Sequence, residues 1–460
     1  MVLEEVVVTS RRRAESLHDV PIAVTAVSAE QLELRGAPDL MDLQRSTPSL
    51  TLQMSRGTNS TLTAFIRGVG QQDPSWGSEP GVGLYIDDVY IARPQGAVPD
   101  TLDLERIEVL RGPQGTLYGR NTIGGAVRYV TRRLGDESEL TLRAEGGNYN
   151  ERNGVAIGSV PVGDSLRIGA APGLGFTQQV SGRVDTESYA LFADLSFEAT
   201  PDLNLYVSYG RGFKSGGFDT RGDAAACPAT VEGYDPETVD SCELGLEANL
   251  FDDRLTLATA IFDQEYRNQQ VTTQFAGPPP SFVVSVADNC GKSRIRGLEF
   301  ETTALLTDRL SAILSTSYFD TEFIEYFTYD PVSGQLIDVA GLRNIRNTPE
   351  WMGFLGLAYR APPGNAGELT VPGSASYRGD VNIFETPVPA IDQQAFTLYD
   401  TSFVWTSPNE SWRPGIYGWS LADKRYRMGG YVFPGELFNK SLIGFYGAPR
   451  TIRASLQYRF

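Results

Sequence analysis

From residue 136 to the carboxy terminus, apolar and polar side chains alternate with a period of two in segment after segment. One such segment is residues 243–250, in which four apolar residues share a face: Leu244, Leu246, Ala248 and Leu250. This period predicts β-strands with two unlike faces. Nowhere does an apolar stretch approach the roughly 20 residues of a membrane-spanning helix, so only strands could carry this chain through a membrane.

The connections between the expected strands distinguish a soluble sandwich, whose apolar face is a core, from a membrane barrel, whose apolar face contacts lipid. Tight turns are expected at residues 200–202, 251–254 and 307–309, and they alternate with long loops near residues 213–239, 269–280 and 328–348. Short turns at one end and long loops at the other are typical of membrane barrels. We therefore expect a mainly β protein with an antiparallel transmembrane β-barrel over residues 136–460, closed by a last strand that ends at Phe460.

The preceding residues, 16–135, predict a smaller α+β domain. Ser28 with Gln31 three residues later forms a capping-box pattern, and Pro38 favours the start of a second helix. Short strands are expected at residues 62–67, 82–87, 106–110 and 126–131. Residues 1–15 contain a β-branched run that predicts one more strand, with no obvious partner nearby.

Charge and motif content exclude several classes of protein. With 57 acidic and 39 basic residues, the net charge of -18 leaves no basic face for nucleic acid. The chain lacks a nucleophile elbow, a phosphate-binding loop and a dinucleotide fingerprint, and its one histidine, His18, has no second histidine for a metal cluster. We expect neither an enzyme nor a bound metal or cofactor.

The three cysteines are too few for a disulfide scaffold. Cys227 and Cys242 bracket a segment rich in Asp, Glu, Gly and Pro, which predicts a loop disulfide between them. Because Cys290 is the third cysteine, one thiol must stay unpaired within the chain, and the sequence alone does not determine which.

Seven motifs along the chain carry a family resemblance. They are Phe65–Gly70, Tyr85–Tyr90, Glu105–Gly115 and Tyr118–Asn121 in the first part, and Ser208–Phe218, Arg296–Glu299 and Asp423–Tyr426 in the second. Together they resemble the TonB-dependent outer-membrane receptors, in particular the iron-complex type of sphingomonad-like bacteria. The resemblance implies a plug domain inside the barrel, TonB as partner, a monomer in outer-membrane lipid, and uptake of a ferric siderophore. Haem, cobalamin, nickel complexes and oligosaccharides are other cargoes of such receptors.

The first motif of the resembled family is a TonB box, here Glu4, Glu5, Val6, Val7, Val8 and Thr9. An extended segment of this kind can add a strand to a periplasmic partner's sheet, and main-chain hydrogen bonds between the two then provide the affinity. β-Branched residues suit this function because they favour the extended state. An ordinary flexible terminus is the alternative interpretation of the same residues.

The resemblance also implies a set of ion pairs that seats the plug: Arg67 and Arg111 against Glu243 and Glu299. Alternation supports the orientation of the two glutamates, because each lies on the polar face of its segment. Buried ion pairs are weak evidence of net stability, so we expect a function in seating or release of the plug. Alternatively, these four residues only line a wet lumen.

Ligand recognition is expected at the plug apices, within residues 71–80 and 93–95. The candidates are Gln71, Trp76, Arg93 and Gln95. Trp76 could stack on a planar ligand and Arg93 could pair with an anionic ferric chelate, although such residues on loops are often unspecialised.

Barrel length is where the sequence departs from the resembled family, whose barrels have 22 strands. Residues 136–460 would leave roughly 15 residues for each of 22 strands with its connection, too few when a membrane strand takes about 9 to 11. We find about 14 strand candidates, and we place an internal deletion near residues 165–202. A 14-strand barrel would scarcely enclose a plug of about 115 residues. A transport-incompetent shortened receptor and a passive porin or adhesin are therefore the rival interpretations.

Overall fold

The structure, a computed structural model, describes most of the chain. The described residues are 6–37, 40–54, 61–72, 78–95, 104–133, 136–162, 166–170, 191–219, 233–276, 283–329, 335–361, 366–433 and 439–460. None of the described helices combines the length and the apolar character that crossing a membrane requires.

The N-terminal elements form two small sheets with short helices, and we call residues 6–133 the plug. Its strands are β1 (Val7–Val8), β2 (Glu15–Ser16), β3 (Val24–Ser28), β4 (Leu50–Met54), β5 (Leu62–Ile66), β6 (Val69–Gly70), β7 (Val82–Ile86), β8 (Val89–Tyr90), β9 (Leu104–Arg111) and β10 (Gly125–Thr131). Its helices are η1 (Leu17–Asp19), α1 (Ala29–Arg35), η2 (Leu40–Asp42), α2 (Leu43–Ser46) and α3 (Gly115–Tyr118). These two sheets have the orders β3-β9-β10-β7-β8 and β4-β5-β6, and β1 and β2 form a separate two-stranded sheet.

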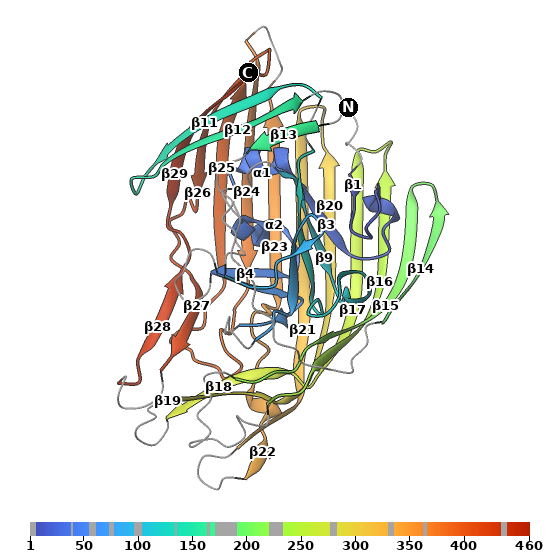
Figure 1. The fold of residues 1–460 in the computed structure, drawn as a ribbon, viewed down its shortest axis with the longest axis vertical. Helices are drawn as coiled ribbons and strands as arrows, with labels where there is room; N and C mark the ends of the chain where they lie inside the picture. Colours follow the sequence, from blue (N-terminus) through green and yellow to red (C-terminus); the bar gives the residue numbers. More distant parts are fainter. Residues whose placement is uncertain are drawn as a thin grey trace.

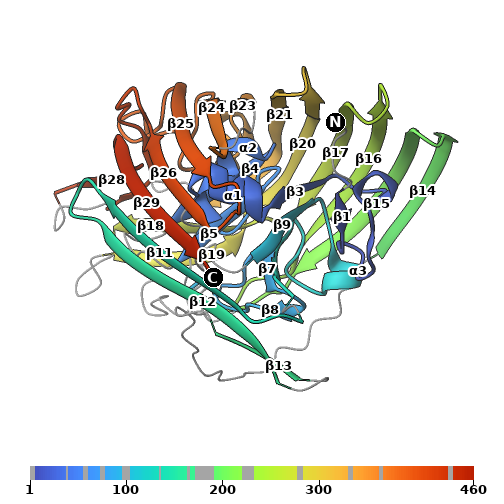
Figure 2. The ribbon, with the colours of Figure 1, turned by 90° about the horizontal axis from the view of Figure 1, so that it is seen from above.

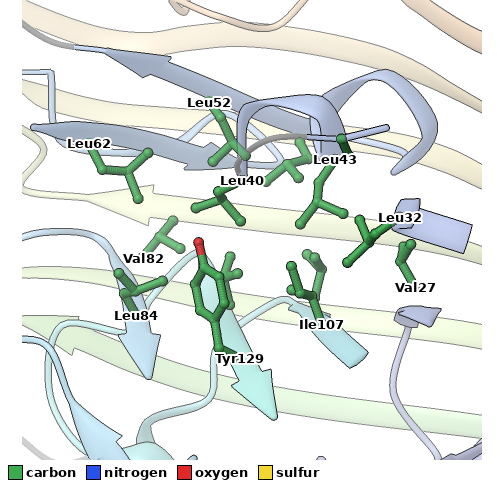
Figure 3. Close-up of a cluster of buried hydrophobic side chains, with 14 of the residues drawn as sticks. Val27, Leu32, Leu40, Leu43, Leu52, Leu62, Val82, Leu84, Ile107 and Tyr129 are labelled. Carbon is green, nitrogen blue, oxygen red and sulfur yellow. The ribbon is translucent and has the colours of Figure 1, made fainter. Parts of the chain in front are cut away.

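A buried apolar cluster fills the space between these two sheets and the first helices. Figure 3 shows side chains of both sheets pointing toward one another, among them Leu52, Leu84 and Ile107. Leu32 of α1 and Leu43 of α2 close one side of the cluster. Burial of each such side chain contributes about 1.5 to 3 kcal/mol, so the plug has a core of its own.

The rest of the chain forms one long antiparallel sheet, which we call the wall. Fourteen strands follow one another in the order β13-β12-β11-β29-β26-β25-β24-β23-β21-β20-β17-β16-β15-β14. Their bounds are β11 (Glu139–Gly147), β12 (Arg152–Val162), β13 (Leu166–Ala170), β14 (Leu191–Thr200), β15 (Leu203–Lys214), β16 (Glu237–Leu250), β17 (Leu255–Arg267), β20 (Gly291–Leu305), β21 (Leu310–Tyr329), β23 (Trp351–Arg360), β24 (Glu368–Arg378), β25 (Phe396–Thr406), β26 (Trp412–Trp419) and β29 (Thr451–Arg459). The number agrees with the 14 strand candidates expected from the sequence.

The wall curves around the plug, and Figure 2 shows the blue N-terminal elements lying on its concave side. Its convex face carries exposed apolar side chains from almost every strand, including Leu195, Phe197, Val207, Leu244, Ile261, Leu298, Leu314, Leu355, Tyr377, Phe403, Ile416 and Leu456. A sheet whose apolar side chains point away from its own interior is typical of a membrane barrel, where that face contacts lipid.

Connections differ between the two ends of the wall. The tight turns at residues 200–202, 251–254 and 306–309 join consecutive strands at one end, as expected. At the other end, the expected long loops contain strands of their own, seen at the bottom of Figure 1: the hairpin β18 (Gln270–Ala276) with β19 (Val283–Asn289), and β22 (Leu336–Asp338) paired with β21. A further hairpin joins β27 (Arg427–Val432) to β28 (Leu442–Tyr446), and η5 (Ala340–Leu342) follows β22.

Closure of the wall differs from the expectation. Within the described residues, the sheet begins at β13 and ends at β14 without pairing between these two strands, so it forms an open trough. We expected a sheet of 14 strands to enclose too little space for the plug, because barrel diameter grows with strand number. The plug helix α3 contacts β14 beside the opening.

Candidate functional site

Arg67 reaches the wall from a tight hairpin turn in the plug. β5 and β6 are joined by two residues, Arg67 and Gly68, with φ angles of 51° and 75°. Both angles lie in the left-handed region, as a two-residue type I′ turn requires. A non-glycine residue in this region is uncommon. A Cβ on Gly68 would lie 2.4 Å from the Thr348 side chain, so the turn fits closely against the wall.

The Arg67 guanidinium lies between two wall glutamates. Its Nη1 is 2.6 Å from Glu243 Oε2, while Nε and Nη2 donate to the two carboxylate oxygens of Glu299 at 2.9 and 2.7 Å. Arg67 is fully buried, and the Phe262 ring lies 4.0 Å from its guanidinium carbon. Such a bidentate pair fixes geometry as well as charge, so it sets both the height and the rotation of this turn in the trough.

Arg111, at the end of β9, extends the same cluster. Its Nε lies 3.4 Å from Glu299 Oε2, and its Nη2 pairs with Glu301. Glu301 also accepts hydrogen bonds from the plug hydroxyl of Thr25, at 2.9 and 2.8 Å. The structure therefore brings together all four residues named from the sequence, and it adds Glu301.

Opposite charge holds both arginines in their charged form. Burial lowers the pKa of the Arg67 guanidinium, but the Glu243 and Glu299 carboxylates outweigh it and raise that pKa above its ordinary value. Burial likewise opposes the charge of Arg111, and Glu301 together with Glu299 raises its pKa. Both guanidinium groups therefore keep their positive charge in this buried cluster.

Several members of the cluster were not named from the sequence. Glu301 lies two residues beyond Glu299 in the same strand, and the period of two was a signal for it. Tyr206 donates its hydroxyl to Glu243 at 2.7 Å, and Phe262 stacks on Arg67. No sequence signal identified these two, because their closeness to Arg67 depends on strand register between distant segments.

A second set of polar contacts fastens α1 to the strands near the carboxy terminus. Glu33 accepts from Arg143 at 3.1 Å and also pairs with Arg413. The indole N–H of Trp419 donates to the carbonyl oxygen of Arg35 at 3.0 Å. The plug is thus held at both sides of the trough.

The N-terminal segment is paired within the plug, contrary to the expectation of a strand without a local partner. β1 pairs antiparallel with β2, joining Val7 to Ser16 and Val8 to Glu15. The turn at residues 9–12 brings the two strands together, with the Arg12 N–H donating to the Thr9 carbonyl at 2.9 Å. Glu4 and Glu5 lie outside the described residues.

One face of the segment is buried while the other stays accessible. Val8 is fully buried, whereas Val6 and Val7 are 42% and 45% exposed. The Tyr118 hydroxyl donates to the Ser10 carbonyl at 2.5 Å, which ties the segment to α3.

Thr9 is held by a buried charge cluster on β9 and β10. Its N–H donates to Glu108 Oε1 at 2.8 Å, and its hydroxyl oxygen accepts from Arg106 at 3.0 Å and Arg128 at 2.9 Å. Glu108 in turn pairs with Arg106 at 2.8 Å and Arg128 at 2.6 Å. These contacts with Arg106, Glu108 and Arg128 fix Thr9, and with it the N-terminal segment, to the plug sheet.

The four candidate ligand residues are not brought into one described site. Gln71 is half-buried, whereas Arg93 and Gln95 are exposed, with a bridge between Gln95 and Thr61. Trp76 lies outside the described residues. Within the part of the chain that the structure describes, no group of His, Cys, Asp and Glu is arranged to hold a metal ion.

The predicted disulfide is not formed by Cys242. This residue lies inside β16, opposite Tyr209 of β15, and carries a free, exposed thiol. Its side chain follows the alternation of β16 onto the same face as Leu244, away from the trough. Cys227 lies outside the described residues, and Cys290 is a buried free thiol.

Proteins of known sequence provide the first comparison. The chain is 28% identical over 231 residues to the "Iron-regulated outer membrane virulence protein" of Vibrio cholerae, covering 45% of this chain and 33% of that protein. It is 25% identical over 242 residues to the "Vitamin B12 transporter BtuB" of Vibrio vulnificus, covering 51% and 36%. It is 34% identical over 130 residues to the "Pesticin receptor" of Yersinia pestis, covering 28% and 18%. The matched part thus spans about a third or less of each relative. Two of these names describe a transporter and a receptor, and none of the three names an enzyme.

Solved structures and a family model provide the second comparison. The ferric yersiniabactin uptake receptor FyuA from Yersinia pestis matches with a TM-score of 0.73 at 15% identity, covering 96% of this chain and 98% of that one. The siderophore receptor PiuA from Acinetobacter baumannii matches with a TM-score of 0.72 at 14% identity, covering 97% and 98%. At this identity the likeness concerns the fold. The model "TonB dependent receptor-like, beta-barrel" matches residues 42–432, most of the chain. The chain therefore belongs to the TonB-dependent receptor-like β-barrel family of the bacterial outer membrane.

Proposed function

We propose that the chain takes up a scarce solute across the outer membrane, driven by TonB. The observation that carries this proposal is the N-terminal segment, an extended strand with one accessible face, attached to a plug that lies in an apolar-faced wall. The three parts of the proposed transporter are the TonB box and linker, residues 1–15, the remainder of the plug domain, residues 16–135, and the transmembrane barrel, residues 136–460. We propose that it acts as a monomer in lipid.

TonB would bind by adding a strand to the TonB box, Glu4 to Thr9. Val7 and Val8 already have the extended conformation that strand addition needs, but β2 occupies one edge of the segment. Binding would therefore require exchange of the β2 pairing for pairing with the partner. The segment is tied near the short-turn end of the wall, where Asn204 at the start of β15 donates to the His18 carbonyl at 2.9 Å. In membrane barrels short turns face the periplasm, where TonB is found.

The buried cluster of Arg67, Arg111, Glu243 and Glu299 would seat the plug during this pulling. Ion pairs of this kind are directional and break as a unit, because removal of one partner leaves the others buried and unpaired. The cluster would thus resist small displacements of the plug. Its ion pairs would break together when the plug is pulled far enough along the wall to separate the arginines from the glutamates.

The proposed cargo is a ferric siderophore. Relatives and structural neighbours support this choice, because their names include siderophore receptors and an iron-regulated protein. A cobalamin transporter among the relatives makes a corrinoid the competing cargo. Gln71, Trp76, Arg93 and Gln95 remain the proposed contact residues, with Arg93 facing the anionic groups of the chelate.

Uptake in iron-starved cells tests the proposal. Cells producing the full chain should accumulate at least one radiolabelled ferric siderophore from a panel, and deletion of residues 4–9 should abolish uptake while cells still bind the ligand. Deletion of the exposed residues 439–440, at a hairpin tip, serves as the matched control. Uptake that survives the deletion of residues 4–9 would overturn the assignment of the TonB box.

The open wall favours a second candidate, a shortened receptor that binds but does not transport. Among the described residues, β13 and β14 each have an edge without a strand partner. Binding without energised uptake by the full chain, under conditions where a known receptor transports, would support this candidate instead.

A further inference from the structure

A cavity of about 60 Å³ lies between the plug and the wall. One lining residue, Ser317, is opposite Glu299 of the Arg67 cluster, but Arg67 and the glutamates of that cluster do not line the cavity. Its wall side is one row of residues across four neighbouring strands. Ser317 of β21 is opposite Met352 of β23, Met352 is opposite Arg378 of β24, and Arg378 is opposite Phe396 of β25. Its plug side is formed by α2 and β4.

Arg378 is a cation that faces this cavity without a carboxylate. Its Nη1 donates to the Gln44 side-chain oxygen at 3.3 Å and its Nη2 donates to the Thr51 hydroxyl, and both partners are neutral. Among the described residues, no acidic side chain lies within ion-pair distance of Arg378. A partly buried guanidinium with only neutral partners has unmet capacity for an anion.

The surrounding charges do not compensate Arg378. Arg45 also lines the cavity, and it forms ion pairs with Asp400 and with Asp42, the latter at 3.4 Å. These two carboxylates are therefore already paired. Arg427 donates to the backbone carbonyl of Asp392 at 2.9 Å rather than to a carboxylate. The cavity therefore has an excess of positive charge.

Aromatic rings form another side of the cavity. Phe396 and Tyr426 stack with ring centroids 4.6 Å apart and an interplanar angle of 21°. Met352 lies across the strand from Arg378 and adds a polarisable apolar surface. An apolar face beside a guanidinium matches a flat ligand with an anionic edge.

We propose that this cavity is a binding site for an aromatic carboxylate. The carboxylate pairs with the Arg378 guanidinium, and the ring lies against Met352 and the outer face of the Phe396–Tyr426 stack. The cavity volume corresponds to on the order of five water molecules, which matches one ring carrying one carboxylate. The site requires neither TonB nor a particular cargo, so its existence is independent of the uptake proposed above.

Calorimetric titration of the purified full chain in detergent tests the site, with benzoate as the probe. Benzoate should bind saturably, while benzamide, of the same shape but neutral, should bind at least about tenfold more weakly, because it loses the charge-assisted hydrogen bonds. Arg378→Gln, which can still hydrogen-bond Thr51, should weaken benzoate binding by about tenfold or more. Phe396→Leu keeps the charge and should weaken binding severalfold.

Arg360→Gln is the matched control, because Arg360 pairs with the exposed plug residue Glu30 at 2.9 Å and does not line the cavity. Its benzoate affinity should equal that of the unmodified chain. Circular dichroism melting verifies folding of each variant. If Arg378→Gln fails to fold, benzamide and Phe396→Leu still decide the question. Absence of saturable benzoate binding, equal binding of benzamide, or unchanged affinity in folded Arg378→Gln would each overturn the proposal.

Discussion

Removal of the Arg67 charge should destabilise the plug more than any other single change in the cluster. Arg67→Gln leaves both Glu243 and Glu299 buried with less compensation, and it also removes the cation beside the Phe262 ring. Loss of one partner of a buried pair costs about 3 to 5 kcal/mol. Because two carboxylates are affected, we expect about 5 kcal/mol for Arg67→Gln.

Glu299→Gln should cost less, about 3 kcal/mol, because Arg67 retains Glu243 and Arg111 retains Glu301. The double variant lacks both the Arg67 charge and the Glu299 charge, so neither of the two is left buried without its partner. The two losses should therefore not add, and we expect the double variant to cost about 5 to 6 kcal/mol, a coupling of about 2 to 3 kcal/mol.

Urea titration in detergent micelles measures these free energies of plug unfolding. Trp419 is a suitable reporter, because its indole donates to the plug carbonyl of Arg35 and its fluorescence should change when the plug leaves the wall. The control is Arg459→Gln, which breaks a pair with Glu139 at the outer part of the wall and should cost less than about 1 kcal/mol. Additive losses, or a cost below about 1 kcal/mol for Arg67→Gln, would refute the seating argument.

Three further changes test other parts of the plug and the wall. Thr9→Val removes a hydroxyl that contacts three buried charges, so amide exchange of residues 6–9, measured by mass spectrometry, should speed up about tenfold. Burial raises the pKa of Tyr85 to about 12, so the stability that its hydroxyl adds is complete below pH of about 10 and declines toward pH 12; the difference in melting temperature from Tyr85→Phe should shrink over that window. Gly297→Ala places a Cβ 2.5 Å from both the Phe262 ring and the Tyr318 carbonyl oxygen, and it should cost about 1 to 3 kcal/mol. An unchanged melting temperature would contradict this close packing.

Local patterns predicted much of this fold because they act over a few residues. The capping box at Ser28 is formed in full, with Gln31 N–H donating to the serine and the Gln31 side chain accepting from the Ser28 N–H. The expected strands at residues 62–67, 82–87, 106–110 and 126–131 correspond to β5, β7, β9 and β10. Alternation likewise identified which face of β16 would be polar, and Glu243 lies on it.

Relations between distant segments were beyond such patterns. A period of two assigns Glu299 to a face, but the height at which it meets Arg67 depends on the register of every strand between them. The same reason explains why the cavity at Arg378 had no signal. The pairing of β1 with β2 is local and was missed for another reason, because β2 has only two residues and shows no strand pattern. A repeated strand pattern carries no information on circumference, so the sequence did not determine how β13 and β14, the two ends of the described sheet, lie relative to each other.

The gap between β13 and β14 has a consequence for how a chain of this kind could grow. These strands are consecutive in sequence, so extra hairpins introduced between residues 170 and 191 would enlarge the circumference without changing any existing strand pair. Antiparallel order would allow only an even number of added strands. The ion pairs of Arg67 and Arg111 are made to β16 and β20, far from that point of insertion, and would be inherited unaltered by the wider protein.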